Sequence, residues 1–281
     1  MLPLSKFCVF FQLSVATSLS FLPLRAAEPV FVVFQNGGSV PLSSIALQDD
    51  KLVITAPTEG FVVGQAYPMA LADHIYGPKP VEINQGIALI LMGRQDEGLK
   101  LLEPLVISQQ ASAKIPGNFW LETARAVLIA YAVNRNAERC AEIGTQISDA
   151  TPAQGVDPFV SLGKVLLMPS TTAPKISEVA FNDLTTDNLP ADVSAYASYF
   201  RGILFKKSKQ NKEALESFLS VSSLFPSGGV IINGAAELQA AEYLLLLGRG
   251  EETKSILRSS ISQSTGTVIV EEANKKLINL K

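Results

Sequence analysis

Residues that carry common catalytic chemistry are scarce in this chain of 281 residues. It has one histidine, His74, and two cysteines, Cys8 and Cys140. A serine or cysteine nucleophile that works with a histidine base would have to use His74. Glycine-rich phosphate loops, Cys-x-x-Cys pairs and His-Glu-x-x-His sequences do not occur. We therefore expect no catalytic residue, no cofactor and no metal site.

Charged residues are also few. They make up 17% of the chain, and the formal net charge is −3 at pH 7. No run of Lys and Arg forms a basic stripe, so we expect no nucleic acid among the partners. Hydrophobic residues make up 47%, which excludes a disordered chain and provides enough apolar surface for a large core.

The first 27 residues resemble a secretory signal peptide. Lys6 precedes an apolar stretch over roughly residues 7–24, and the small residues Ala26 and Ala27 follow it. Several Ser and Thr residues within the stretch disfavour the alternative, an uncleaved membrane anchor. We expect an exported protein of the periplasm or cell envelope, which would touch the membrane only through an uncleaved signal.

Cleavage of this segment would leave Cys140 without a second cysteine. Export would permit disulfides, yet no intramolecular bridge could then form. Cys140 lies in a stretch with helical periodicity, at a position where helix packing favours a small residue. We expect a small buried hydrophobe rather than a reactive thiol.

Residues 28–78 predict a small β-rich module. Runs of β-branched and aromatic residues are separated by turn signals such as Asn-Gly and Asp-Asp, which is typical of hairpins. The runs cover Val30–Phe34, Val40–Leu47, Leu52–Thr55 and Tyr67–Ile75. We expect four or five short strands in a small sheet or barrel, packed against the first helices. The module either caps the helical part, which we favour, or offers a second docking surface.

Helical periodicity dominates residues 79–281, where Gly and Pro act as breaks. Short connections make successive helices antiparallel, so the sequence predicts a row of helical hairpins. The predicted helices cover roughly residues 81–92, 95–110, 118–134, 136–149, 157–168, 174–186, 191–208, 211–224, 233–248, 250–263 and 270–279.

Four of these hairpins share a sequence signature. A polar turn precedes an acidic residue, which is Glu97, Glu138, Glu213 or Glu252, and a small residue and an apolar pair follow. Negative charge in the first turn of a helix interacts favourably with the helix dipole. We interpret these acids as helix-capping residues and assign them no catalytic role.

Residues 196–226 form the clearest unit. Gly202 and Ala214 are small where two helices must touch, and Phe205 and Phe218 lie beside them. Such units resemble tetratricopeptide repeats, in which small residues of two helices pack against each other between large apolar residues. The resemblance covers roughly residues 79–265. It implies a mainly α fold, an α-solenoid of antiparallel hairpins behind the β-rich module, and the binding of another protein.

The other units depart from the pattern of the family. They recur at about 40 residues, whereas tetratricopeptide repeats recur at roughly 34. In one unit Leu128 and Gly144 belong to the wrong size classes, and Pro104 should kink or end its predicted helix. The proline-rich stretch of residues 151–192 is either a degenerate hairpin or a joint between two sub-arrays.

In tetratricopeptide arrays the first helix of each pair lines a concave groove. The resemblance therefore assigns Tyr196, Tyr199, Lys206 and Lys207 to such a groove, together with Arg125 from an earlier unit. Tyrosine and arginine are common at interface hot spots, and a lysine pair can bind a peptide carboxylate. The alternative is that the tyrosines pack on neighbouring helices and that the lysines are a solvated helix end.

The sequence thus predicts a non-catalytic scaffold or adaptor of the bacterial cell envelope that binds another protein or peptide. One alternative is a structural envelope protein that assembles with copies of itself. A less favoured alternative is an envelope enzyme built on an α-solenoid, because the chain lacks catalytic motifs.

Overall fold

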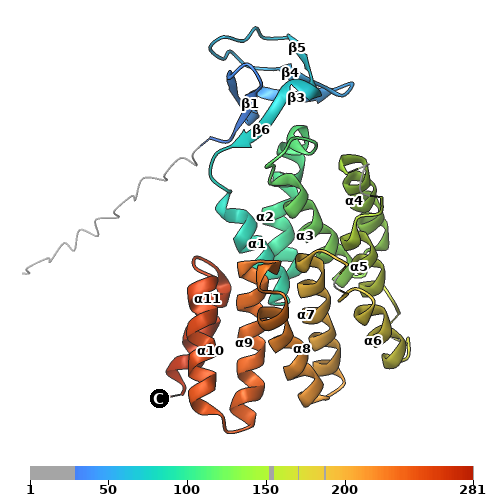
Figure 1. The fold of residues 1–281 in the computed structure, drawn as a ribbon, viewed down its shortest axis with the longest axis vertical. Helices are drawn as coiled ribbons and strands as arrows, with labels where there is room; N and C mark the ends of the chain where they lie inside the picture. Colours follow the sequence, from blue (N-terminus) through green and yellow to red (C-terminus); the bar gives the residue numbers. More distant parts are fainter. Residues whose placement is uncertain (1–28, 152–154, 170, 187, 281) are drawn as a thin grey trace, which may run out of the picture.

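The computed structural model describes residues 29–151, 155–169, 171–186 and 188–280. Within these ranges the protein is mainly helical: it has 11 α-helices, 63% of the residues are helical when the short 3-10 helices are included, and there are two small antiparallel sheets. The sheets lie at one end of the long axis, and the helices occupy the rest of the molecule (Figure 1). The predicted signal peptide, residues 1–27, lies outside the described residues.

The β-rich module consists of two three-stranded antiparallel sheets. One sheet has the strand order β2-β1-β6 and the other has the order β3-β4-β5. The strands are β1 (Phe31–Phe34), β2 (Ser39–Pro41), β3 (Ile45–Gln48), β4 (Lys51–Ile54), β5 (Ala66–Pro68) and β6 (Ala72–Tyr76). There are six strands rather than four or five, because a short 3-10 helix interrupts two of the predicted runs.

Each interruption follows a proline. Pro41 precedes the 3-10 helix Leu42–Ser44, and Pro68 precedes the 3-10 helix Met69–Leu71. Proline lacks a backbone N–H and so cannot continue a strand ladder. At both points the chain crosses from one sheet to the other. The module therefore has two halves with the same order of elements, and the last strand of each half pairs with the first strand of the other half.

The module packs on the connection between the second and third helices. Ile115 of this connection is 1% exposed and belongs to the same apolar cluster as Val32 and Leu52 of the sheets. The backbone N–H of Ile75 in β6 donates to the carbonyl of Pro116 at 2.9 Å. The module is thus held by apolar contacts and by a backbone hydrogen bond.

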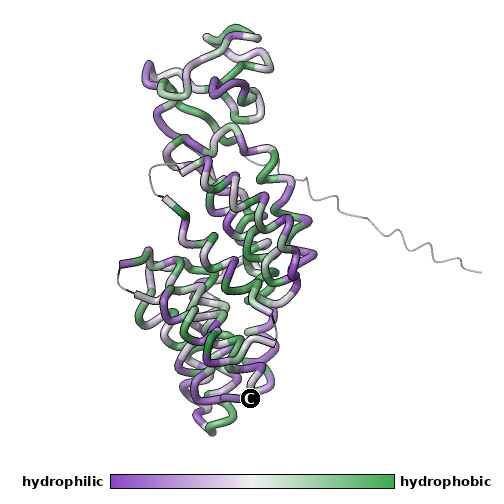
Figure 2. Tube along the Cα trace, turned by 90° about the vertical axis from the view of Figure 1, so that its right-hand side faces the viewer, coloured by the Kyte–Doolittle hydropathy of each residue, from purple (hydrophilic) through white to green (hydrophobic). Residues whose placement is uncertain are grey.

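A helix is present in each segment where the sequence predicts one. The helices are α1 (Val81–Leu91), α2 (Gln95–Ser108), α3 (Trp120–Val133), α4 (Ala137–Ala150), α5 (Pro158–Leu166), α6 (Pro174–Asn182), α7 (Ala191–Lys207), α8 (Asn211–Leu224), α9 (Val230–Leu246), α10 (Gly250–Gln263) and α11 (Val268–Ile278). Hydrophobic and hydrophilic residues alternate along them (Figure 2), as expected of amphipathic helices. Pro104 does not end α2, which continues to Ser108.

Four helical hairpins close through the same kind of turn. Gly93, Arg135, Lys209 and Gly248 have left-handed backbone, with φ of 82°, 62°, 59° and 73°. A left-handed residue after a helix redirects the chain and satisfies carbonyls at the helix end. In each turn the next residue donates its backbone N–H to a carbonyl near the end of the first helix, at 2.8 to 3.0 Å. The shared sequence signature therefore corresponds to a shared turn.

Small residues allow the two helices of a hairpin to approach closely. A Cβ atom on Gly86 of α1 would lie 2.5 Å from the side chain of Leu102 in α2. A Cβ atom on Gly202 of α7 would lie 2.7 Å from the ring of Phe218 in α8. Both distances are shorter than van der Waals contact, so the glycines are required by packing.

The hairpin of α3 and α4 uses the opposite arrangement. Relative to its turn, Leu128 holds the position of Gly202, and Gly144 holds the position of Phe218. A Cβ atom on Gly144 would meet Leu128 at 3.7 Å, and one on Gly163 of α5 would meet it at 2.7 Å. In this hairpin the large residue thus lies in the first helix and the small residue in the second, the reverse of the family pattern. Leu128 also packs on α5.

Helix α1 packs against helices that are distant in sequence. It contacts α9 and α11 as well as α2 and α3. The hydroxyl of Tyr199 in α7 donates to the carbonyl of Leu91 at 2.5 Å, and the side-chain amide of Gln85 donates to the carbonyl of Gly266 at 3.4 Å. In a linear array each hairpin touches only its sequence neighbours, so these contacts close the helical part on itself.

Candidate functional site

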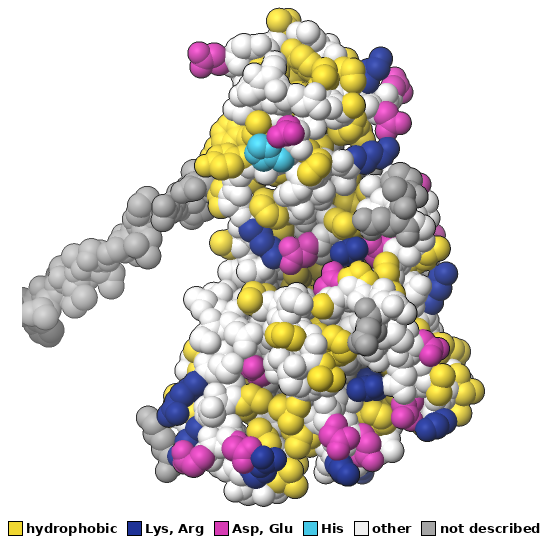
Figure 3. All heavy atoms as spheres, viewed as in Figure 1, with side chains coloured by type: hydrophobic (Ala, Val, Ile, Leu, Met, Phe, Trp, Pro, Cys, Tyr) yellow, Lys and Arg dark blue, Asp and Glu magenta, His cyan; other side chains and the backbone are white. Residues whose placement is uncertain are grey.

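A cleft of about 620 Å³ opens between the turn after α1, the ends of α3 and α7, and the segment from α5 to α6. Pockets that bind small molecules or peptide side chains commonly enclose about 300–1,000 Å³. Hydrophobic side chains reach the surface between charged groups on the face of the helical part shown in Figure 3. The cleft is therefore the candidate binding site.

The lining of the cleft is mostly apolar. Ile90, Leu91, Phe181 and Phe200 are each less than 8% exposed. Ile203 of α7 lines the cleft as well and is half-buried. These side chains form an apolar floor that a bound group can cover, and each apolar side chain that a partner buried there would contribute about 1.5–3 kcal/mol.

The charged residues that line the cleft are all cations. They are Arg135, Lys206 and Lys207, and no Asp or Glu belongs to the lining. Lys207 is exposed and makes no ion pair with any residue that the structure describes. In a chain with net charge −3, a cleft lined only by cations favours an anionic group on the partner.

Two of the three cations already bind groups of the protein. The guanidinium of Arg135 donates to the carbonyl of Leu166 at 2.8 Å and also to the carbonyl of Met168. It thereby satisfies carbonyls at the end of α5, where the helix leaves them without an internal partner. Lys206 donates to Gln239 at 2.8 Å and to Glu242 at 2.7 Å.

Glu242 joins three helices at this point. Its carboxylate accepts hydrogen bonds from Lys206 of α7 at 2.7 Å and from Lys276 of α11 at 2.8 Å. Burial would raise the pKa of Glu242, but the hydrogen bonds from the two lysines outweigh it and lower the pKa. Glu242 therefore holds α7, α9 and α11 together, and Lys206 supplies the contact from α7.

The structure brings three of the five predicted groove residues to the cleft, namely Tyr199, Lys206 and Lys207. Tyr199 is 0% exposed, and burial raises the pKa of its hydroxyl, which donates to Leu91. Its side chain packs behind the apolar floor, and no part of it is exposed for contact with a partner. Of these three residues, Lys207 alone keeps a charge that is free to bind an anionic group.

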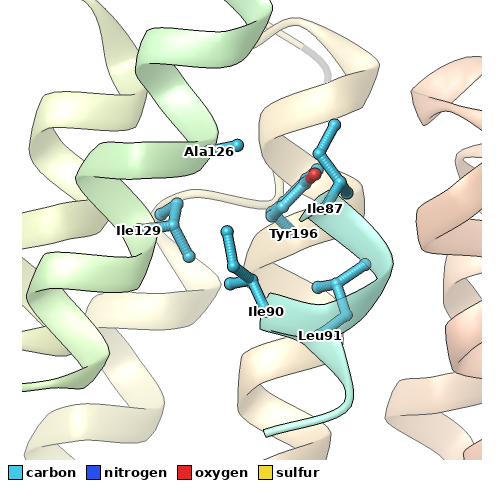
Figure 4. Close-up of a pocket in the computed structure, with 6 residues that line it drawn as sticks. All are labelled: Ile87, Ile90, Leu91, Ala126, Ile129 and Tyr196. Carbon is cyan, nitrogen blue, oxygen red and sulfur yellow. The ribbon is translucent and has the colours of Figure 1, made fainter. Parts of the chain in front are cut away.

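Tyr196 lies in a closely packed apolar junction beside the cleft. Figure 4 shows its ring between α1 and α3, with the hydroxyl directed toward Ile87. The junction is lined by Ile87, Ile90, Leu91, Ala126, Ile129 and Tyr196. Burial raises the pKa of the Tyr196 hydroxyl. The ring therefore packs on α1, a helix that is distant in sequence. The alternative stated from the sequence was that the tyrosines pack on neighbouring helices.

Arg125 does not line the cleft. Its guanidinium binds Asp157 at 2.6 Å and Asp192 at 3.3 Å, and it lies 4.8 Å from the ring of Phe159. The Asp157 side chain is 0% exposed and also caps the start of α5 by accepting the N–H of Phe159. Arg125 thus joins α3 to the beginnings of α5 and α7.

No motif in the sequence marks the residues of the apolar floor as a binding site. One wall of the cleft comes from α5, α6 and the described residues between them, within the stretch for which the sequence predicts a degenerate hairpin or a joint. This wall includes Met168 and Phe181. Their only sequence signal is an apolar side chain beside a cluster of prolines, which is common at ordinary loops.

The other side chains that could act as a catalytic base, a nucleophile or a metal ligand are isolated from one another. His74 lies in β6, as predicted, 2.8 Å from the carboxylate of Asp73, and both side chains are largely exposed. Cys140 is buried as predicted, and burial raises the pKa of its thiol. Within the described ranges, no three His, Cys, Asp or Glu side chains gather as they would around a metal ion.

A membrane span is not found among the helices of the described residues, since none is both long enough and apolar enough. The comparison of this chain with known protein families, with curated proteins and with solved structures finds no match. The cleft and its charges are therefore the basis on which a function is proposed.

Proposed function

We propose that this protein is a non-catalytic scaffold or adaptor that holds a segment of another protein in the cleft. The observation that carries the proposal is the cleft of about 620 Å³ with its apolar floor. Apolar side chains of a partner would gain about 25 cal/mol for each Å² of surface removed from water there. Central, desolvated pockets of this kind provide most of the affinity of protein interfaces.

The architecture that we propose is a tetratricopeptide-like α-solenoid that is closed by α1. The shared turns at Gly93, Arg135, Lys209 and Gly248 support this proposal. So do the pairs Gly86–Leu102 and Gly202–Phe218, which hold equal positions in two of the hairpins. The contacts of α1 with α9 and α11 distinguish this arrangement from an open array.

We also propose that the protein works outside the cytoplasm, in the cell envelope. The support is the apolar stretch with one preceding lysine and small residues after it in residues 1–27. Self-association stays the alternative within binding functions, because a second copy could also supply an apolar segment.

Site-specific photocrosslinking in intact cells tests the proposal. A photoreactive residue at Met168, which lines the cleft, should give one discrete adduct with another protein. The same residue at Lys212, whose side chain is 83% exposed on α8, is the matched control and should not give this adduct. Ile203→Asp, which places a charge on the floor, should remove the adduct from Met168.

Two outcomes would contradict the proposal. A ladder of adducts between copies of this chain would favour the self-assembling alternative. No adduct from Met168, or equal adducts from Met168 and Lys212, would show that the cleft does not hold a protein partner. The thermal unfolding of Ile203→Asp is measured beside these experiments, so that loss of the fold is not mistaken for loss of binding.

A further inference from the structure

We infer that the cleft binds one face of an amphipathic α-helix and that an acidic residue of this helix pairs with Lys207. The inference rests on the proposed protein-binding function and adds the conformation and the charge of the bound segment. It follows from three properties of the cleft. Polar side chains of its lining already make hydrogen bonds within the protein, its size is limited, and its charge is positive.

The polar side chains beside the floor are already bonded within the protein. Tyr199 donates to Leu91 at 2.5 Å, and Gln95 donates to the carbonyl of Ile90 at 3.4 Å. Arg135 caps the end of α5, and Lys206 is bound by Gln239 and Glu242. Besides Tyr199, the hydroxyl side chains of the cleft are Thr172 between α5 and α6, Ser177 of α6 and Ser208 after α7.

An extended peptide on this floor would bury backbone amides without partners. Each unpaired buried donor or acceptor costs about 1–3 kcal/mol. A helical segment does not meet this cost, because its N–H and C=O groups bond to each other. The apolar floor therefore selects a helix over an extended strand.

The size of the cleft determines how such a helix lies. A space of about 620 Å³ is in the range of pockets that hold side chains. The cleft would therefore receive apolar side chains of one helix face, directed at Ile90, Phe200 and Ile203, while the helix axis lies at the mouth. Side chains spaced i, i+3, i+4 and i+7 present such a face.

The charge of the cleft determines what flanks that face. The lining contains three cations and no acid, and the protein neutralises Lys206 through Glu242. Lys207 follows Lys206 at the end of α7 and is free among the described residues. A glutamate or aspartate beside the apolar face of the helix would complement this charge.

Binding of designed probe peptides to the purified protein tests the inference. One peptide carries leucines at i, i+3, i+4 and i+7 with a flanking glutamate, and a second carries lysine in place of that glutamate. A third has the composition of the first with a central proline that breaks the helix. We expect the glutamate peptide to bind at least about threefold more tightly than the lysine peptide at low salt, and the proline peptide to lose binding.

Charge reversal gives the sharpest result. K207E should reverse the preference, so that the lysine peptide binds more tightly than the glutamate peptide. K212E is the matched control, since Lys212 is exposed, pairs with Glu216 and does not line the cleft, and it should leave the preference unchanged. Ile203→Ala, which removes apolar contact without adding a charge, should weaken both peptides equally.

Equal binding of the first and third peptides would overturn the helical conformation, and an unchanged preference in K207E would overturn the pairing with Lys207. Binding of dodecanoate without binding of any peptide would assign the cleft to an acyl chain. A discrete cellular adduct from Met168 without peptide binding would overturn this inference and leave the proposed function standing. If neither the cellular adduct nor peptide binding is observed, both the proposed function and this inference are overturned.

Discussion

At the scale of single residues, the charged side chains of this protein differ in what they support. Arg125 binds a carboxylate that is 0% exposed, whereas Lys207 is free at the surface. A buried charge is costly unless it is paired and hydrogen-bonded. We therefore expect Arg125 to stabilise the fold and Lys207 to be available for binding, although both have the same sign and both lie in the first helix of a hairpin.

Arg125→Ala should destabilise the protein by about 3–5 kcal/mol, because it leaves Asp157 buried without its partner. Urea unfolding followed by circular dichroism measures this loss. Arg249→Ala is the control, since Arg249 lies just before α10, is 49% exposed and pairs with Glu252 in the first turn of that helix, and it should cost at most about 1 kcal/mol. Equal losses in the two variants would show that Asp157 does not depend on Arg125.

At the scale of elements, the turns between helices carry the internal regularity of the chain. Glycine occupies the left-handed position in two hairpins, and Arg135 and Lys209 occupy it in two others. Residues with a Cβ atom pay about 1–2 kcal/mol for this backbone conformation. The four hairpins thus share one left-handed turn geometry. Glycine favours this geometry strongly in two of the turns, whereas Arg135 and Lys209 favour it weakly in the other two.

Two substitutions at equivalent turns should have opposite effects. Lys209→Gly should stabilise the protein by up to about 1 kcal/mol, because glycine adopts left-handed backbone without strain. Gly93→Ala should destabilise it by about 1 kcal/mol, and the cause is backbone strain alone, since no atom lies within 4 Å of the new Cβ. Urea unfolding midpoints measure both, and shifts of the same sign would contradict the shared turn geometry.

The β-rich module shows a second internal regularity. Each half contains two strands, a proline, a 3-10 helix and a further strand, and the halves exchange their last strands. The prolines Pro41 and Pro68 were visible in the sequence, yet strand exchange depends on pairing between residues far apart. The strand segments were predictable because they depend on local residues. Their distribution over two sheets was not predictable, because it depends on pairing between distant residues.

At the scale of the whole molecule, closure through α1 connects the beginning of the helical part to its end. Tyr199 and Gln85 make hydrogen bonds across this closure, and Glu242 joins α7, α9 and α11. Linear arrays unfold in steps, because each repeat is stabilised only by its neighbours. A closed arrangement removes this independence.

Native-state hydrogen exchange should therefore detect one cooperative unit that contains α1, α7 and α9. The buried amides of these helices should exchange with the same free energy of opening. Tyr199→Phe, which removes the hydrogen bond to Leu91, should lower that free energy by about 0.5–1.5 kcal/mol in all three helices together. A decrease confined to α7 would show that the hairpins open independently.

The sequence by itself determined the positions of the helices and most strands, the burial of Cys140 and the acidic first turns that include Glu97 and Glu213. These features depend on periodicity and on neighbours within a few residues. Only the tertiary structure decided that Tyr196 and Tyr199 are packed against α1, that Arg125 is bound by Asp157, and that apolar side chains of several helices form the cleft. The reason is that these environments are created by contacts between residues far apart in the chain, which no local pattern records.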